Sequence, residues 1–180
     1  MNNTKNVLTL LSGLFQYPDD QYKDKVTRCM SVIERDWDQE SPWFSKFHEF
    51  VLSMSIDDLE ESYTRTFDLN PVCSPDIGWH LFGEDYNRGL FLARLRREMR
   101  RIGIEESCQL PDHLSHVLLI LSGFEINNAS DFATACVIPA LEKMDGALDE
   151  KSSDWLGLVR SVLNVLKSAY LNDVKETADV

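Results

Sequence analysis

The stretch LPDHLSHVLLIL (residues 110–121) shows most directly what kind of fold this chain adopts. A purely apolar run follows His116. Asp112 is a residue type that caps helix N-termini, so the stretch predicts a helix that Asp112 caps and that runs to about Phe124. Its polar head, with His113 and His116 one helical turn apart, also raises the question of a functional site.

The helical period continues on both sides of this stretch. Ser55 with Asp58 resembles a capping box, Gly103 is placed to end a helix, and Pro139 is expected to kink or interrupt a helix over about 130–148. No segment shows the alternation of a strand. We therefore predict an all-α fold, a single globular domain of about seven or eight helices over residues 1–172, with a frayed tail over 173–180. The apolar stripes expected on three of these helices are Tyr22, Val26, Met30, Ile33 and Trp37; Leu92, Leu95, Met99 and Ile102; and Trp155, Leu158, Val159, Val162, Val165 and Leu166.

One segment breaks the pattern in the middle of the chain. DLNPVCSPDIGWHLFGED (residues 68–85) holds two prolines, two glycines and an Asn-Pro step, which predict a long loop. Long loops inside compact domains are usually functional, and aromatic rings beside carboxylates suit a peptide with apolar and cationic side chains. The alternative is a plug whose aromatic side chains complete the core. The side chains concerned are Phe67, Trp79, His80 and Phe82 with Asp68, Glu84 and Asp85.

Composition narrows the functional classes. The 180 residues carry a formal net charge of −12, which repels nucleic acid and anionic membrane surfaces and attracts basic partners. The N-terminal segment lacks the pattern of a signal peptide, and no window approaches the roughly 18 apolar residues of a membrane span. We therefore expect a cytoplasmic protein that binds no nucleic acid and does not insert into a membrane.

The arginine run RLRREMRR (residues 94–101) is interpreted as a helix surface. Six of the ten arginines lie between Arg88 and Arg101, where they flank a predicted buried stripe and have acidic residues nearby. Such a pattern is typical of a solvated helix face rather than an RNA site.

Two other functions stay open from the residues alone. Asp112, His113 and His116, with Glu84, could serve a metal-dependent enzyme, since carboxylate and imidazole groups are common metal ligands. Nucleotide-binding glycine motifs and the G-x-S-x-G motif are absent, which leaves no other enzyme class favoured. A helical adaptor without client specificity is the second alternative.

Three blocks of sequence, taken together, carry a resemblance. They are LEESYTRTFDLNP (59–71), WHLFGEDYNRG (79–89) and LPDHLSHVL (110–118). In order and spacing these blocks resemble the NarJ-type nitrate reductase molybdenum cofactor assembly chaperones, a family of the redox enzyme maturation proteins. The resemblance implies an all-α cytoplasmic chaperone without catalysis of its own.

The same resemblance implies a binding site for a peptide. The ligand would be the N-terminal peptide of a molybdoenzyme catalytic subunit, in the form of a twin-arginine leader or its remnant. Asp112 and His113 would then form the polar lip of a groove, whereas His116 falls where the family motif varies. The implied peptide-binding residues are Tyr63, Phe67, Asp68, Trp79, His80, Gly83, Glu84, Asp85, Arg88, Asp112 and His113.

The resemblance further implies what the chaperone serves. It would hold the catalytic subunit for insertion of molybdopterin guanine dinucleotide before membrane docking or export, and would itself bind no cofactor tightly. Cofactor-biosynthesis proteins are a further partner class, and the chaperone is expected to be a monomer or homodimer. A respiratory nitrate reductase is the first candidate client. The departures at VCSPDIGWH (72–80) and YN (86–87) leave selenate, chlorate, dimethyl sulfoxide and hydrocarbon-oxidising enzymes open.

Overall fold

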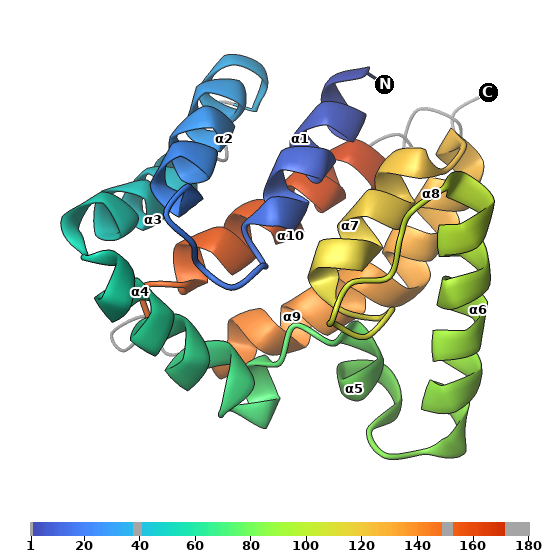
Figure 1. The fold of residues 1–180 in the computed structure, drawn as a ribbon. Coiled ribbons are helices and arrows are strands. Elements are labelled where there is room, and N and C mark those ends of the chain that lie inside the picture. Colours follow the sequence, from blue (N-terminus) through green and yellow to red (C-terminus); the bar gives the residue numbers. More distant parts are fainter. Residues whose placement is uncertain (1, 38–40, 149–152, 172–180) are drawn as a thin grey trace.

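The computed structural model describes residues 2–37, 41–148 and 153–171, and within them every regular element is helical (Figure 1). The all-α prediction is confirmed. The described residues hold more helices than the seven or eight predicted, because the mid-chain segment contains a helix and a π-helical turn separates α8 from α9. The predicted frayed tail, residues 173–180, lies outside the described residues. The α-helices are α1 (Asn2–Gly13), α2 (Tyr22–Asp36), α3 (Ser41–Ser53), α4 (Ile56–Tyr63), α5 (Ile77–Phe82), α6 (Tyr86–Ile102), α7 (Leu114–Gly123), α8 (Ile126–Phe132), α9 (Ile138–Ala147) and α10 (Leu156–Tyr170).

Local signals in the sequence set several helix boundaries. The Ser55 hydroxyl accepts a hydrogen bond from the Asp58 N–H at 3.2 Å and opens α4, as predicted. Gly103 ends α6 with a left-handed φ of +75° that glycine adopts without strain. Pro139 lies in the first turn of α9, directly after the π-helical turn Ala133–Val137, so the predicted interruption occurs there.

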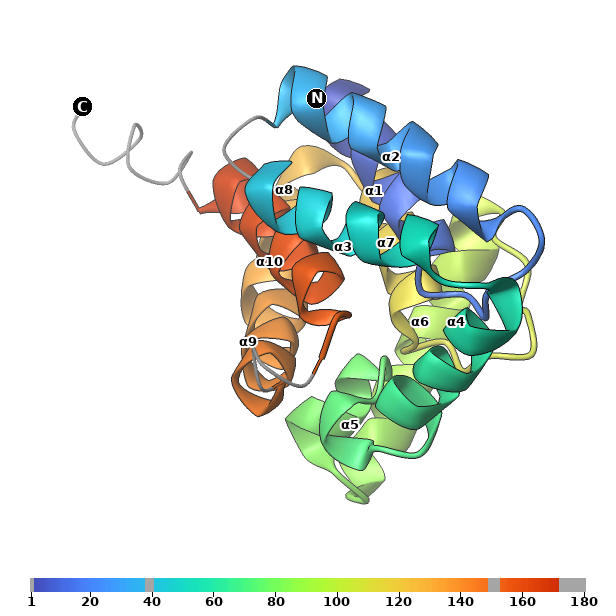
Figure 2. The ribbon, with the colours of Figure 1, turned by 90° about the vertical axis from the view of Figure 1, so that its left-hand side faces the viewer.

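The helices pack in an order that places α7 inside the molecule. α1 lies against α7 and α2, while α10 packs against α3 and α9 (Figures 1 and 2). α6 stands at one edge of the molecule with α5 beside its first turns (Figure 1). Most residues of α7 are buried, and the helix ends at Gly123, close to the predicted Phe124. Among the described residues, no helix is both long and apolar enough to cross a membrane.

An aromatic cluster centred on Trp155 fixes the start of α10 to α2, α3 and α4. The Trp155 indole N–H donates to the Ser62 hydroxyl at 3.0 Å, which satisfies its polar group inside the core. Tyr63 ends α4, and Phe67 lies in the π-helical turn that follows, so the cluster adjoins the start of the mid-chain segment. The rings within 6.2 Å of the Trp155 ring, centroid to centroid, are those of Tyr22, Phe47, Phe50, Tyr63 and Phe67.

Candidate functional site

The mid-chain segment is ordered by backbone pairing rather than irregular. The Ile77 N–H donates to the Asp112 carbonyl and the Leu114 N–H donates to the Pro75 carbonyl, both at 2.9 Å. This pairing holds the start of α5 against the start of α7. The prediction of one long loop over 68–85 is therefore wrong in detail: α5 and the short 3-10 turn Pro71–Cys73 lie within it.

Arg88 joins the three segments that meet here. Its Nη2 lies 2.9 Å from Asp76 Oδ2, and its Nε lies 3.1 Å from Asp112 Oδ2. Asp112 is fully buried, whereas the side chains of Arg88 and Asp76 are 20% and 22% exposed. The Arg88 guanidinium carbon also lies 5.9 Å from the centre of the Trp79 ring. One guanidinium thus connects α6, α5 and the segments that precede α5 and α7.

The N-cap of α7 is His113 and not Asp112, so the predicted cap is wrong. His113 Nδ1 accepts a hydrogen bond from the Ser115 N–H at 3.2 Å. Asp112 is unsuited to that role here because Arg88 binds one oxygen of its carboxylate. The other oxygen, Oδ1, is buried and has no hydrogen-bond donor among the described residues. The carboxylate therefore depends strongly on its ion pair with Arg88.

A groove opens at the surface above this ion pair, and we call it the Trp79 groove. Its volume is about 430 Å³, and four of the predicted site residues contribute to it. Leu69, which lines it, is 74% exposed, and the neighbouring Val72 is 55% exposed, so apolar surface continues beyond its edge. The lining residues are Phe67, Asp68, Leu69, Pro71, Ser74, Asp76, Trp79 and Arg88.

Other predicted site residues lie around this groove or beneath it. Tyr63 is a core residue: it is 1% exposed and its hydroxyl donates to the Phe15 carbonyl at 2.6 Å. Gly83 ends α5 with a φ of +61°. Glu84 and Asp85 are exposed in the turn before α6, where the Asp85 carboxylate caps the helix by accepting from the Asn87 N–H at 2.8 Å.

The ring nitrogens of His80 and His116 make hydrogen bonds within the fold. His80 Nε2 lies 2.7 Å from the Ser74 carbonyl oxygen, to which it donates, and burial lowers the pKa of His80. His116 Nδ1 lies 2.9 Å from the Leu110 carbonyl, and its Nε2 lies 3.1 Å from the Ser107 hydroxyl. His116 thus holds the segment before α7 with both ring nitrogens.

The geometry gives the metal-enzyme alternative no support. A lone pair of His116 is unavailable to a metal while its two nitrogens hold Leu110 and Ser107. Among the described residues, no three histidine, cysteine or acidic side chains are placed to share a metal ion.

Asp76 is the functional candidate that sequence reasoning missed. It lines the Trp79 groove and pairs with Arg88, and burial followed by the nearby negative charge of Asp112 raises its pKa. A signal was present in the sequence, because Pro75-Asp76 repeats the Pro111-Asp112 step. The groove residues Leu69, Pro71 and Ser74 were missed as well, and no signal singles them out.

His113 is expected to make the fold sensitive to mild acid. Burial, assisted by His116, lowers the pKa of His113 from 6.5 to about 4. The unfolded chain then binds a proton at a higher pH than the folded chain, so stability is full above pH 6.5 and falls as the pH drops toward 4. The expected loss is roughly 2 kcal/mol between about pH 6.5 and pH 5.

Urea unfolding across this pH range checks the expectation. His113→Asn keeps a cap acceptor but removes the titration, so its stability should change much less above pH 5. His48→Asn, at a partly buried histidine on α3, is the matched control and should behave as the parent. Equal pH dependence in the parent and in His113→Asn would contradict the assignment.

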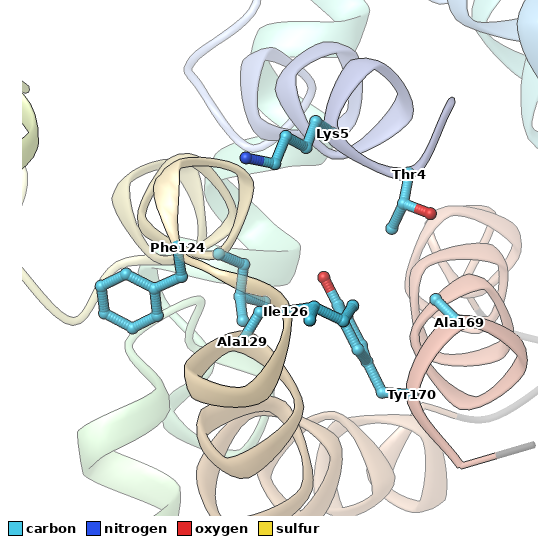
Figure 3. A pocket seen from close by; sticks show the side chains of 8 residues that line it. Thr4, Lys5, Phe124, Ile126, Ala129, Ala169 and Tyr170 are labelled. Atoms are coloured by element: carbon cyan, nitrogen blue, oxygen red, sulfur yellow. The ribbon is translucent and has the colours of Figure 1, made fainter. Parts of the chain in front are cut away.

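A smaller cavity lies among α1, α7, α8 and α10. Its volume is about 90 Å³, and Lys5 of α1 and Tyr170 of α10 face it, with Phe124 at its edge (Figure 3). That volume suits a few water molecules and not a peptide. This cavity is therefore not a candidate for the peptide site.

Comparisons with known proteins bear on these features. The profile of the family described as "Nitrate reductase delta subunit" matches residues 37–160. "Probable nitrate reductase molybdenum cofactor assembly chaperone NarW" of Escherichia coli (strain K12) is 24% identical over 93% of this chain and 71% of its own length. "Probable nitrate reductase molybdenum cofactor assembly chaperone NarJ" of Bacillus subtilis (strain 168) is 24% identical over 99% of this chain and 98% of its own.

A solved structure shares the fold. It is described as "Crystal Structure Of A Putative Redox Enzyme Maturation Protein From Archaeoglobus Fulgidus", with a TM-score of 0.61 and 23% identity over 91% of this chain and 93% of that one. The relatives carry the names of assembly chaperones and not of enzymes, which agrees with the prediction of a protein without catalysis. The family predicted from the three sequence blocks is confirmed: this chain belongs to the nitrate reductase delta subunit family.

Proposed function

We propose that this protein is a cytoplasmic chaperone that binds the N-terminal peptide of a molybdoenzyme catalytic subunit in the Trp79 groove. The peptide is a twin-arginine-type leader or its remnant, and a respiratory nitrate reductase is the first candidate client. Binding would hold the subunit back from membrane docking or export while molybdopterin guanine dinucleotide is inserted into it. The cofactor is cargo of the client and needs no resident site in this chain.

The observation that carries the proposal is the composition of the groove. Trp79 and Phe67 offer aromatic surface, while Asp68 and Asp76 line the same space with carboxylates. Burial raises the pKa of both carboxyl groups, which means that their charged forms are poorly solvated. Arg88 already pairs with Asp76 in this groove, so an incoming guanidinium or ammonium group would be favoured most beside Asp68.

A helical peptide fits this arrangement best. The apolar face of an amphipathic helix would lie on Trp79, Phe67 and the exposed Leu69, and its cations would lie near Asp68 and Asp76. Glu84, exposed at the nearby turn, adds negative charge that steers a basic peptide toward the groove. His113 and Asp112 lie beneath, where they set the shape of the groove rather than contact the peptide directly.

Calorimetric titration with a peptide of the client's first 30 or so residues tests the proposal. We expect Trp79→Ala to weaken binding at least about tenfold, because a central aromatic anchor is removed. Trp43→Ala, at a partly buried tryptophan on α3, is the matched control and should bind as the parent does. Affinity should also fall as salt is added, since part of the attraction is between charges.

Three results would contradict parts of this picture. Equal binding by Trp79→Ala and the parent would keep the chaperone but exclude this groove. Salt-independent binding would remove the role of Asp68 and Asp76. Equal binding of a peptide with a scrambled sequence would favour the non-specific helical adaptor.

A further inference from the structure

A second groove lies between α6 and α8, with Phe82 of α5 at one end, and we call it the phenylalanine groove. Its volume is about 560 Å³, which exceeds that of the Trp79 groove. The proposed leader site makes no use of it. The residues that line it are Phe82, Phe91, Arg94, Leu95, Arg97, Glu98, Arg101, Phe124, Asn128, Asp131, Phe132 and Cys136.

Four phenylalanine rings form a continuous row along this groove. The Phe82 and Phe91 ring centroids are 5.4 Å apart, those of Phe91 and Phe132 are 6.4 Å apart, and those of Phe132 and Phe124 are 5.9 Å apart. The row crosses from α5 over α6 to α8 and the end of α7. A long apolar floor of this kind suits the side chains of one face of a helix.

Arginines from α6 form one rim of the groove. Arg94, Arg97 and Arg101 are exposed and follow one another at helical spacings of three and four. Arg97 and Arg101 share Glu98, at 3.8 and 2.7 Å, whereas Arg94 has no ion-pair partner among the described residues. The Arg101 guanidinium carbon also lies 5.6 Å from the centre of the Phe124 ring, so charge and apolar floor adjoin.

The net charge of the groove is opposite in sign to that of the whole chain. Three arginines and two acidic residues line the groove, a net charge of +1, while the whole chain carries −12. The other three arginines of α6 lie outside the groove lining. A basic leader would be repelled here and an acidic segment attracted.

We infer that the phenylalanine groove binds an acidic amphipathic helix of a partner protein. Apolar side chains of that helix lie on the phenylalanine row, and its carboxylates, three or four residues apart, meet Arg94, Arg97 and Arg101. The inference goes beyond the proposed function, because this surface differs from the leader site in place and in the charge of its ligand. The chaperone would thus hold two segments of opposite charge in two grooves that share no lining residue.

Two designed helical peptides with the same leucine-rich face provide the test, one with flanking glutamates and the other with flanking lysines. We expect the glutamate peptide to bind with micromolar affinity in fluorescence anisotropy, and the lysine peptide at least about tenfold more weakly. Arg94→Glu should lower the affinity for the glutamate peptide about tenfold. Arg100→Glu makes the same charge change at an exposed arginine of α6 outside the groove, and should leave binding unchanged.

Competition with the leader peptide separates this inference from the proposed function. The two peptides should bind together, and Arg94→Glu should leave leader affinity unchanged. Equal weakening by Arg94→Glu and Arg100→Glu, or equal binding of both designed peptides, would overturn the inference. Displacement of the glutamate peptide by the leader peptide would also overturn the inference. Binding of a single-stranded oligonucleotide that Arg94→Glu abolishes, with no binding of the glutamate peptide, would reassign the face to nucleic acid.

Discussion

Asp112→Ala is expected to lower the free energy of unfolding by about 3 kcal/mol, because it leaves the Arg88 guanidinium without its buried partner. Arg88 binds Asp112 Oδ2 from α6, and the Asp112 carbonyl accepts from the Ile77 N–H at the start of α5. The carboxylate is fully buried, so its loss also leaves a cavity that α5 and α7 must close. The partial exposure of Arg88 and its second partner, Asp76, keep the expected effect at the lower end of the range for buried pairs.

Urea unfolding monitored by circular dichroism measures this effect. Asp76→Ala is the matched variant, since it removes the partly exposed carboxylate from the same guanidinium and should destabilise by only about 1 kcal/mol. Both variants should bind the leader peptide more weakly than the parent, because Arg88 and Asp76 line the groove. A larger loss of stability from Asp76→Ala than from Asp112→Ala would mean that the buried pair does not hold α5 and α7 together.

The helical frame could be predicted because its signals are local. Apolar residues at spacings of three and four marked α2, α6 and α10, and Gly103 marked the end of α6. α5 escaped prediction because two prolines precede it, Gly78 lies within it and Gly83 ends it, and because a six-residue helix has little stability of its own. Backbone pairing with the segment before α7 stabilises it, and no local pattern encodes that pairing.

The cap of α7 shows the same limit at a single residue. Aspartate is the better capping residue, so the sequence favoured Asp112 over His113. Arg88, far away in the chain, binds the Asp112 carboxylate, and the cap moves to His113. Local preference was correct for Ser55, whose side chain has no such competing partner.

The candidate site was only partly visible in the sequence. Phe67, Asp68, Trp79 and Arg88 were predicted from the resemblance, and they line one groove. The contact between Arg88 and Asp112 could not be predicted from composition and periodicity, because 24 residues separate them in the chain. Tyr63 was among the implied peptide-binding residues, yet its aromatic ring belongs to the core around Trp155.

Gly78→Ala is expected to lower the free energy of unfolding by about 3 kcal/mol, because the added methyl group has no room. An ideal Cβ at Gly78 would lie 2.4 Å from Asp112 Oδ2 and 3.1 Å from Phe91 Cδ1. Either the carboxylate leaves Arg88 or α5 moves away from α6 and α7. Both movements would also change the Trp79 groove, so we expect weaker leader binding from the folded variant.

A double-mutant cycle with Asp112→Ala tests the cause. Once the carboxylate is gone, the methyl group has space on that side, so Gly78→Ala should destabilise the Asp112→Ala background by at least about 1 kcal/mol less than the parent. Gly89→Ala is the control: Gly89 lies within α6 with no atom within 4 Å of an added Cβ, and alanine there should stabilise the helix by about 0.5–1 kcal/mol. Additive effects of Gly78→Ala and Asp112→Ala would show that contact with Phe91, and not with the Asp112 carboxylate, requires glycine at this position.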